Sequence, residues 1–285
     1  MAKVIQDKEP EQAAKEEYAA EQLSEEKAKE VVAEIEKKEK PLPKAKKEAA
    51  YIECKQSTLM DAISLMDGLL NEVVMTIDEG TGLTAAAMDP ANVAMVVLDL
   101  KPAAFAAIKG AAKVGVNIHS LKKMLKRAAA EDNVRITFKN PIELVLASKF
   151  NKTFELPQID VSEEKTQKLP GLKHDAVFKI KTALLKEAVK DCGEIADALR
   201  FEVKNSKLSV SAKGDMSGYT GEVADLTDVK DCASGFSREY MTKVIEDVAS
   251  DVTVHLGTEY PILLEYDLGN GSKMSLIVAP RVSND

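Results

Sequence analysis

The sequence contains the same series of motifs twice, and this duplication constrains the fold more than any other feature. The segment LTAAA at 83–87 corresponds to LSVSA at 208–212, which lies 125 residues later. The strand-like VRITF at 134–138 corresponds to VTVHL at 252–256, at an offset of 118 residues. A nearly constant offset indicates two copies of one structural unit with small insertions between them. We therefore expect two similar domains.

Each copy has the pattern of a strand, a helix, a three-stranded meander, a second helix and a closing hairpin. Hairpins between successive strands, without βαβ crossovers, predict mostly antiparallel sheets with helices on one face, an α+β fold. The elements expected in the first copy are 51–54, 58–70, 73–78, 82–88, 93–100, 120–130, 134–139 and 142–150. Those expected in the second copy are 176–180, 183–192, 199–204, 207–212, 218–224, 238–248, 252–257 and 262–267.

Two further segments flank the copies. Residues 1–48 hold 11 Lys and 13 Asp or Glu, a composition that predicts a solvated, mostly disordered extension. The extension could instead be an interaction arm, although no motif in it indicates a partner. Residues 153–173 contain two prolines and a glycine and read as an extended linker. The expected organisation is an extension at 1–48, a domain at 49–152, a connector at 153–173 and a second domain at 174–285.

The composition excludes several classes of protein. Apolar residues make up 45% of the chain and charged residues 30%, as in a globular protein with a core. The net charge of −8 argues against a protein held to nucleic acid by its bulk charge, but not against a local basic patch. No apolar run approaches the ~18 residues of a membrane-spanning helix. The N-terminus has no apolar signal core, so we expect a cytoplasmic protein.

The reactive residues form no recognisable site. Three cysteines are scattered without a CxxC pair, and three histidines are isolated, so neither a disulfide framework nor a metal site is expected. No glycine-rich phosphate-binding motif and no catalytic triad is present, so we expect no cofactor and no catalytic residues. Asp89, which precedes a proline, fits a turn better than an acid–base role. The three cysteines are Cys54, Cys192 and Cys232, and the three histidines are His119, His174 and His255.

One helix carries an unusual charge pattern. On a helical wheel of 120–130, Leu121 and Met124 share one arc, and four cations without an acid share the opposite arc. Unpaired cations on one face suit the phosphates of a polyanion. The same pattern also fits an ordinary amphipathic helix with a solvated face. The four cations are Lys122, Lys123, Lys126 and Arg127.

Four separated motifs give the sequence a specific resemblance. They are LPQID at 156–160, AMDPANVAM at 87–95, EYPILLEY at 259–266 and LIVAPRV at 276–282. In this combination they resemble the archaeal DNA polymerase sliding clamps of the proliferating cell nuclear antigen family. The resemblance extends from about residue 49 to 282, and residues 1–48 have no counterpart in it.

The resemblance implies a fold and a mechanism. Family members form a ring of three subunits, in which helices line a central hole around duplex DNA and antiparallel sheets lie outside. The chain would then be a processivity factor and not an enzyme, and weak phosphate contacts would let it slide. Asp61 and Asp67 depart from the basic first helix that is usual in the family. The cations expected to face the DNA are Lys122, Lys123, Lys126, Arg127, Lys186, Lys190, Arg238 and Lys243.

The resemblance also implies partners. Replication and repair enzymes of this family dock a short peptide, the PIP-box, in an apolar pocket under the connector. Expected partners are a DNA polymerase, a clamp loader, a flap endonuclease and a DNA ligase, besides double-stranded DNA and further copies of the chain. The subunit contact would pair an edge strand at 142–150 with 217–224 of the next copy. The pocket would use Met88, Asn92, Val93, Met95, Leu169, Leu172, Pro261, Ile277, Ala279 and Pro280.

Two alternatives remain open at this stage. A clamp-like protein could have lost its loading or partner binding and act as a scaffold. An unrelated α+β enzyme with a duplicated domain would instead have a deep polar pocket with perturbed carboxylates. For a clamp, the location would be the cytoplasm, at the nucleoid.

Overall fold

The computed structural model describes residues 49–160, 171–245 and 251–281, and residue contacts divide the chain into the units Met1–Glu48 and Ala49–Asp285. The extension expected at 1–48 therefore lies outside the described residues. The first copy contains β1 (Ala50–Lys55), α2 (Gln56–Leu69), β2 (Glu72–Asp78), β3 (Gly82–Met88), β4 (Ala94–Leu100), the 3-10 helix η1 (Pro102–Ala104), β5 (Ala107–Lys109), β6 (Ala111–Asn117), α3 (Ile118–Leu125), β7 (Asn133–Phe138), β8 (Ile142–Ala147) and β9 (Asn151–Leu156).

The second copy repeats this order without counterparts of η1 and β5. Its elements are β10 (Ala176–Lys181), α4 (Thr182–Gly193), β11 (Ala198–Lys204), β12 (Lys207–Lys213), β13 (Gly218–Asp225), β14 (Cys232–Ser237), α5 (Arg238–Ile245), β15 (Asp251–Leu256), β16 (Ile262–Gly269) and β17 (Ser272–Val278).

The strands of the described chain form three antiparallel sheets. A five-stranded sheet has the order β5-β1-β7-β8-β9, and a four-stranded sheet has the order β13-β12-β11-β14. The third sheet has eight strands in the order β10-β15-β16-β17-β4-β3-β2-β6 and draws four strands from each copy. The copies meet where β17 pairs with β4, in a register that runs from Lys273 opposite Asp99 to Val278 opposite Ala94. The eight-stranded sheet is therefore the structural link between the two copies.

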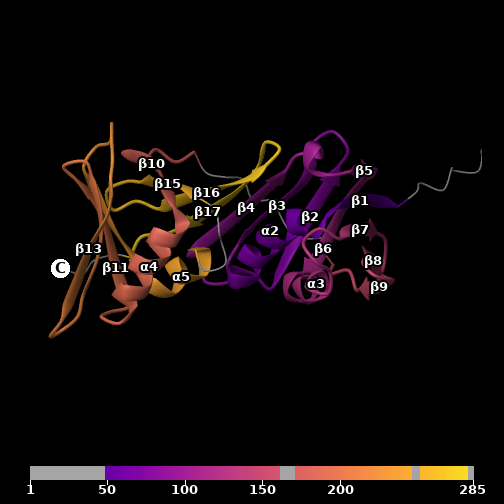
Figure 1. The fold of residues 1–285 in the computed structure, drawn as a ribbon, viewed down its shortest axis with the longest axis horizontal. Helices are drawn as coiled ribbons and strands as arrows, with labels where there is room; N and C mark the ends of the chain where they lie inside the picture. The colour runs from indigo at the N-terminus through magenta and orange to yellow at the C-terminus, as the bar shows by residue number, and fades with distance from the viewer. Residues whose placement is uncertain (1–48, 161–170, 246–250, 282–285) are drawn as a thin grey trace, which may run out of the picture. The chain divides into compact units, whose positions relative to one another are not determined.

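The four α-helices of the described chain form one layer. Contacts join α3 to α2, α2 to α5 and α5 to α4, so the helices of both copies are continuous across the molecule (Figure 1). Gly68 makes the middle contact close, because a Cβ atom there would lie 3.2 Å from the carbonyl oxygen of Lys243 on α5. The absence of a side chain at Gly68 lets the first copy's helix lie directly against the second copy's helix.

Local sequence explains why these helices form where they do. In α2, Leu59, Ile63 and Met66 recur at helical spacing and are all buried, so one face of the helix is committed to the core. In α3, the side chain of Asn117 caps the first turn by accepting a hydrogen bond of 2.9 Å from the backbone N–H of Ser120.

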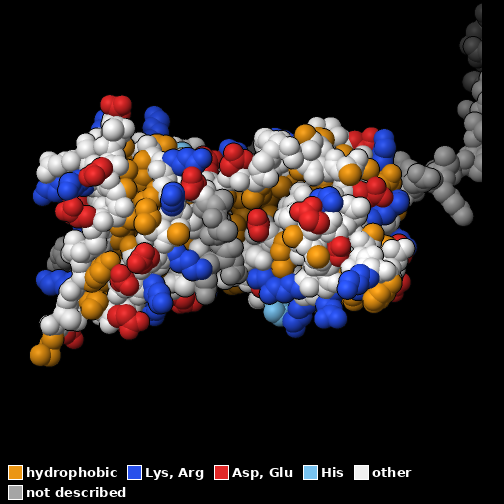
Figure 2. Space-filling model, viewed as in Figure 1, with side chains coloured by type: hydrophobic (Ala, Val, Ile, Leu, Met, Phe, Trp, Pro, Cys, Tyr) orange, Lys and Arg blue, Asp and Glu red, His pale blue; other side chains and the backbone are white. Residues whose placement is uncertain are grey.

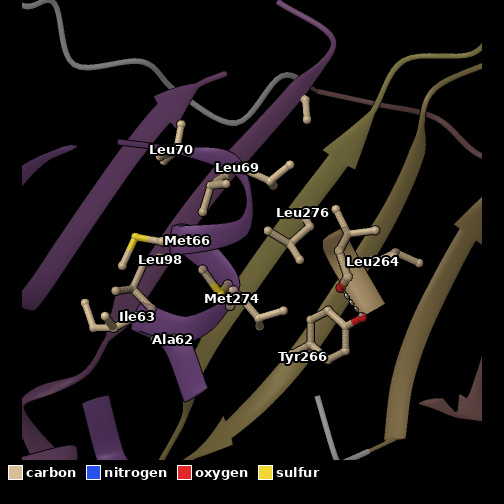
Figure 3. Close-up of a cluster of buried hydrophobic side chains, with 14 of the residues drawn as sticks. Ala62, Ile63, Met66, Leu69, Leu70, Leu98, Leu264, Tyr266, Met274 and Leu276 are labelled. Carbon is tan, nitrogen blue, oxygen red and sulfur yellow. Dashed lines mark hydrogen bonds between the residues drawn. The ribbon is translucent and has the colours of Figure 1, made fainter. Parts of the chain in front are cut away.

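The main core lies between the helix layer and the sheets. Ile63 and Met66 of α2 pack with Leu98 of β4, and Met274 and Leu276 extend the cluster into the second copy (Figure 3). The buried Tyr266 of β16 completes it, because its hydroxyl donates a 3.0 Å hydrogen bond to the carbonyl of Val244 on α5. A single, mostly aliphatic core therefore extends through both copies.

Several expected elements differ from the observed ones. The helix expected at 120–130 ends at Leu125, where the backbone N–H of Lys126 bonds to the carbonyls of Lys122 and Met124. The end of the helix expected at 238–248 lies outside the described residues. Strands β5, β6 and β14 were not expected, because their small, Ala- and Gly-rich segments show no clear period of two.

The expected edge strand at 142–150 is wrong. Strand β8 pairs with β7 on one side and with β9 on the other, so it is interior, and β9 is the outer strand of this sheet. Strand β9 also takes up 153–156, which the sequence analysis assigns to the connector. The reason is that the chain turns at 148–150 and continues the hairpin as one more strand, from Asn151 opposite Ala147 to Leu156 opposite Ile142.

We predict that Leu276→Ala destabilises the protein strongly, because Leu276 is fully buried where the copies share their core. Removing a buried leucine side chain costs about 2–5 kcal/mol in the free energy of unfolding. Leu184→Ala is the matched control, since Leu184 on α4 is exposed and the expected change is below ~0.5 kcal/mol. Urea denaturation would measure both, and equal effects would contradict a core shared by the two copies.

Candidate nucleic-acid interface and docking patch

The basic face of α3 is divided between a paired cation and exposed ones. Lys122 is only 12% exposed in its side chain, and its Nζ lies 3.1 Å from Oδ2 of Asp67 on α2. His119 contacts the other oxygen of the same carboxylate at 3.0 Å. Burial raises the pKa of Asp67, but the contacts from Lys122 and His119 outweigh it and hold this pKa below its usual value. Asp67 on α2 therefore holds α3 in place, and the contact of Lys122 with this carboxylate has a largely structural role.

The three remaining cations of this group are exposed. Lys123 lies on α3, whereas Lys126 and Arg127 follow its last residue. The carbonyl of Arg127 accepts a 2.6 Å hydrogen bond from Lys152 of β9, which adds a further cation beside the helix end. Figure 2 shows Lys and Arg side chains gathered over α3. This cluster is the strongest local basic feature on the viewed face.

A cavity of about 290 Å³ lies between α4 and α5. Lys186 and Lys190 line it from α4, and Arg238 and Thr242 line it from α5. Glu194 also borders it, so the lining is mixed but has more cations than acids. The structure thus brings together three expected DNA-facing cations from separate segments of the second copy.

The cations of α5 are already engaged within the chain. Arg238 contacts Asp197 at 3.2 Å, and Lys243 contacts Glu239 one turn away at 2.6 Å. Lys243 also lies 5.4 Å from the centre of the Tyr240 ring. Surface pairs of this kind are weak and exchangeable. The basic character of the helix layer is consequently uneven, strongest at α3 and more balanced by acids at α4 and α5.

The opposite face of the eight-stranded sheet carries an apolar patch. Met95 of β4, Ile277 of β17 and Leu263 of β16 lie directly opposite one another across the strands. They alternate with Val96, Leu276 and Leu264, which point into the main core, so they face away from the helices. We call Met95, Leu263, Ile277 and the connector residue Leu172, which packs against them, the outer patch.

The structure places the expected pocket residues in different environments. Met95, Leu172 and Ile277 meet in the outer patch, and Met88 lies beside it, opposite Met95 and 39% exposed. Leu263 was not expected, because only the strand register shows that it shares a row with Ile277.

The other expected pocket residues do not join the outer patch. Val93 packs against the main core, and its carbonyl accepts a 2.8 Å hydrogen bond from Ala279. Asn92 is exposed in the turn with a positive φ of 58°. Leu169 lies outside the described residues. Pro261 and Pro280 are half-buried at the ends of the last strands.

A buried carboxylate holds the turn between β3 and β4. Asp89 accepts hydrogen bonds from the backbone N–H groups of Ala91, Val93 and Ala94, at 3.1, 2.7 and 2.7 Å. It also accepts one of 2.7 Å from the hydroxyl of Tyr240 on α5. Burial raises the pKa of Asp89, but these four donors outweigh it and hold the pKa below its usual value. The hydrogen bond from the Tyr240 hydroxyl to Asp89 raises the pKa of Tyr240 to about 12.

The reactive residues have structural surroundings. The three cysteines are buried and free, as expected for packed thiols, and burial raises the pKa of Cys54 to about 12. His255 contacts Glu265 at 3.0 Å, and His174 bonds to the carbonyl of Pro261. Among the residues described, no cluster of His, Cys, Asp or Glu could hold a metal ion. No helix in that part of the chain is long and apolar enough to cross a membrane.

Comparisons with known proteins agree with this geometry. A family model described as "Proliferating cell nuclear antigen, N-terminal domain" matches residues 51–168. The DNA polymerase sliding clamp of Pyrococcus horikoshii is 31% identical over 227 residues, which cover 75% of this chain and 90% of that protein. The sliding clamp of Methanosarcina barkeri is 29% identical over 236 residues and covers 80% and 96%.

Solved structures share the fold. The clamp of Thermococcus kodakaraensis superimposes with a TM-score of 0.75 at 22% identity, covering 81% of this chain and all of that one. A structure of the A. fulgidus clamp, to which the C-terminal region of FEN-1 is bound, has a TM-score of 0.75 at 24% identity and covers 83% of this chain.

We predict that Asp89→Asn removes an acid-dependent part of the stability. Because the folded protein lowers the pKa of Asp89, its contribution is complete above the unfolded pKa of ~3.9 and is lost as the pH falls through the folded value. The difference in free energy of unfolding between wild type and variant should therefore be largest near pH 7 and shrink towards pH 2–3. Asp215→Asn, at an exposed position, is the control. A difference that stays constant with pH would contradict the role of the charge.

Proposed function

The chain belongs to the proliferating cell nuclear antigen family, the DNA polymerase sliding clamps, and we propose that it closes into a ring of three through strands β9 and β13. A sliding clamp is a processivity factor and not an enzyme: it encircles duplex DNA and tethers the enzymes that act on it. The helix layer, continuous over both copies, supports this function in the chain, because it gives the ring one inner surface.

The duplication supports the mode of ring closure. Within the chain, β17, the last strand of the second copy, pairs with β4, the third meander strand of the first copy. The counterparts of these strands are β9 and β13, and each lies at the edge of its sheet. Repeating the internal pairing between chains joins β9 of one copy to β13 of the next. Such head-to-tail contacts form a closed ring when the rotation between successive subunits adds up to a full turn. The resemblance to the family indicates three subunits.

The inner surface would hold DNA through exposed cations without reading sequence. Lys123, Lys126 and Arg127 are exposed, and the cavity lined by Lys186, Lys190 and Arg238 has a volume of about 290 Å³, which is enough for a phosphate group. Lys122, Arg238 and Lys243, being paired with acids, would contribute less. Contacts limited to phosphates carry no sequence information, so the ring can slide.

The outer patch would dock partner peptides. Its methionine and aliphatic side chains form an adaptable apolar surface on the outside of the sheet, and Leu172 of the connector borders it. The bound FEN-1 region in the A. fulgidus structure supports a flap endonuclease as one such partner. A polymerase, a clamp loader and a ligase would use the same patch in turn. The proposal places the protein in the cytoplasm, on the nucleoid.

Reversing the exposed cations of the α3 cluster should impair clamp function without unfolding the chain. We predict that Lys123→Glu, Lys126→Glu and Arg127→Glu together shorten the products of a clamp-dependent polymerase on a long primed circular template. A plot of the logarithm of DNA retention against the logarithm of salt concentration should become less steep, by about 0.9 in slope for each phosphate contact that is lost. The measurement is product length against salt concentration.

The matched control reverses three exposed strand lysines, Lys109, Lys204 and Lys213, which changes the net charge equally. This variant should behave like the wild type. If both triple variants lose the same activity, bulk charge is responsible, and α3 does not face DNA.

A charge beside the outer patch should weaken partner binding. We predict that Leu172→Glu lowers the affinity for a flap-endonuclease C-terminal peptide by roughly tenfold or more, because a carboxylate would have to lose water against apolar groups. Isothermal titration calorimetry gives the affinity, and Ala91→Glu in the exposed turn is the control. Unchanged binding by the Leu172 variant would place the docking site elsewhere.

A further inference from the structure

The two copies differ at one edge. In the first copy, β5 pairs antiparallel with β1, with Lys109 opposite Tyr51 and Ala107 opposite Glu53. In the second copy, β10 corresponds to β1, but no described strand pairs with its outer edge. The cause is chain length: residues 101–110 form η1 and β5 in the first copy, whereas only 226–231 connect β13 to β14. The second copy lacks the residues to build the covering strand.

The other sheet edges of the described chain are accounted for. Ile159 of the connector bridges to Gly115 on β6, and Arg281 donates a 2.8 Å hydrogen bond to the carbonyl of Gly235 on β14. Strands β9 and β13 are the proposed ring contacts. Strand β5 is only three residues long, which makes it a poor template for pairing. Among the described residues, the outer edge of β10 is therefore the one edge of six or more residues that has neither a bound segment nor a proposed ring contact.

The exposure of β10 agrees with a missing neighbour. Val177, which corresponds to Tyr51, is 51% exposed, and Lys179 and Lys181 beside it are also exposed. On the inner side, Phe178 is 8% exposed, whereas its counterpart Ile52 is completely buried. A side chain packed beside Phe178 would complete the core here, as Ile108 of β5 does opposite Ile52.

The charge on this edge is reversed between the copies. In β1, Glu53 pairs with Arg135 of the neighbouring strand at 3.2 Å. In β10, the corresponding residue is Lys179, and the residue opposite it on β15 is the uncharged Thr253. Within the described chain, Lys179 has no ion-pair partner. An occupant of this edge should therefore carry an acid next to Lys179.

We propose that the free edge of β10 is a second docking site, which binds an extended, acidic segment of a partner protein by strand addition. The segment runs antiparallel to β10, as β5 runs to β1, with an apolar residue beside Phe178 and an acidic residue beside Lys179. Backbone hydrogen bonds to the free N–H and C=O groups provide affinity, and the alternate side chains provide specificity. The site lies on another strand than the outer patch, and it depends on neither ring closure nor peptide binding there.

The test uses a capped peptide of alternating isoleucine and glutamate, seven residues long, titrated into the full-length protein. Hydrogen–deuterium exchange should show slower exchange in β10, and the affinity should fall roughly tenfold for Lys179→Glu. Lys204→Glu, at an exposed strand position away from this edge, should bind as the wild type does. A lysine–isoleucine peptide should prefer the Lys179→Glu variant.

A second peptide separates strand addition from simple charge attraction. N-methylation of alternate residues removes the backbone donors on one edge but leaves every charge in place, so this peptide should not protect β10. Equal binding of the methylated and unmethylated peptides would overturn the proposal. So would exchange in β10 that neither peptide changes, because the lysines would then serve only to keep the edge unpaired.

Discussion

The pairing of β17 with β4 is the contact on which the rest of the structure depends. It brings the last strand of the chain against the third strand of the first copy and turns two four-stranded sets into one eight-stranded sheet. One side of that sheet carries the core under α2 and α5, and the other carries the row of Met95, Ile277 and Leu263. The core that joins the copies and the outer patch are therefore products of the same register.

The helix layer proposed to face DNA and the outer patch lie on opposite sides of this sheet. One side chain, that of Asp89, connects the two sides. Asp89 holds the turn that leads into β4, whose Met95 belongs to the outer patch, and it accepts a hydrogen bond from Tyr240 on α5. A carboxylate with four donors is a rigid anchor. It fixes the spacing between the helix layer and the strand that carries the patch, which accounts for the buried charge at a position where the sequence indicates only a turn.

Much of the fold could be predicted from the sequence. The duplication is visible as repeated motifs, and strands such as β12 show a local alternation of buried and exposed residues. The edge strands could not, since β9 follows β8 after a short turn and its residues, such as Lys152 and Thr153, are polar enough to read as linker. Three of the four residues of the outer patch were predicted from the resemblance, but Leu263 required the register with Ile277. The pairing of Lys122 with Asp67 was also hidden, because it joins helices that are far apart in sequence.

The central claim is that the internal junction of β4 with β17 is repeated between chains by β13 and β9. The solution mass of the purified chain, measured by light scattering over a range of concentrations, tests it most directly. Three chains of 31.0 kDa predict a particle of about 93 kDa. A mass that stays at that of one chain, at every concentration, would contradict a ring closed by this chain alone.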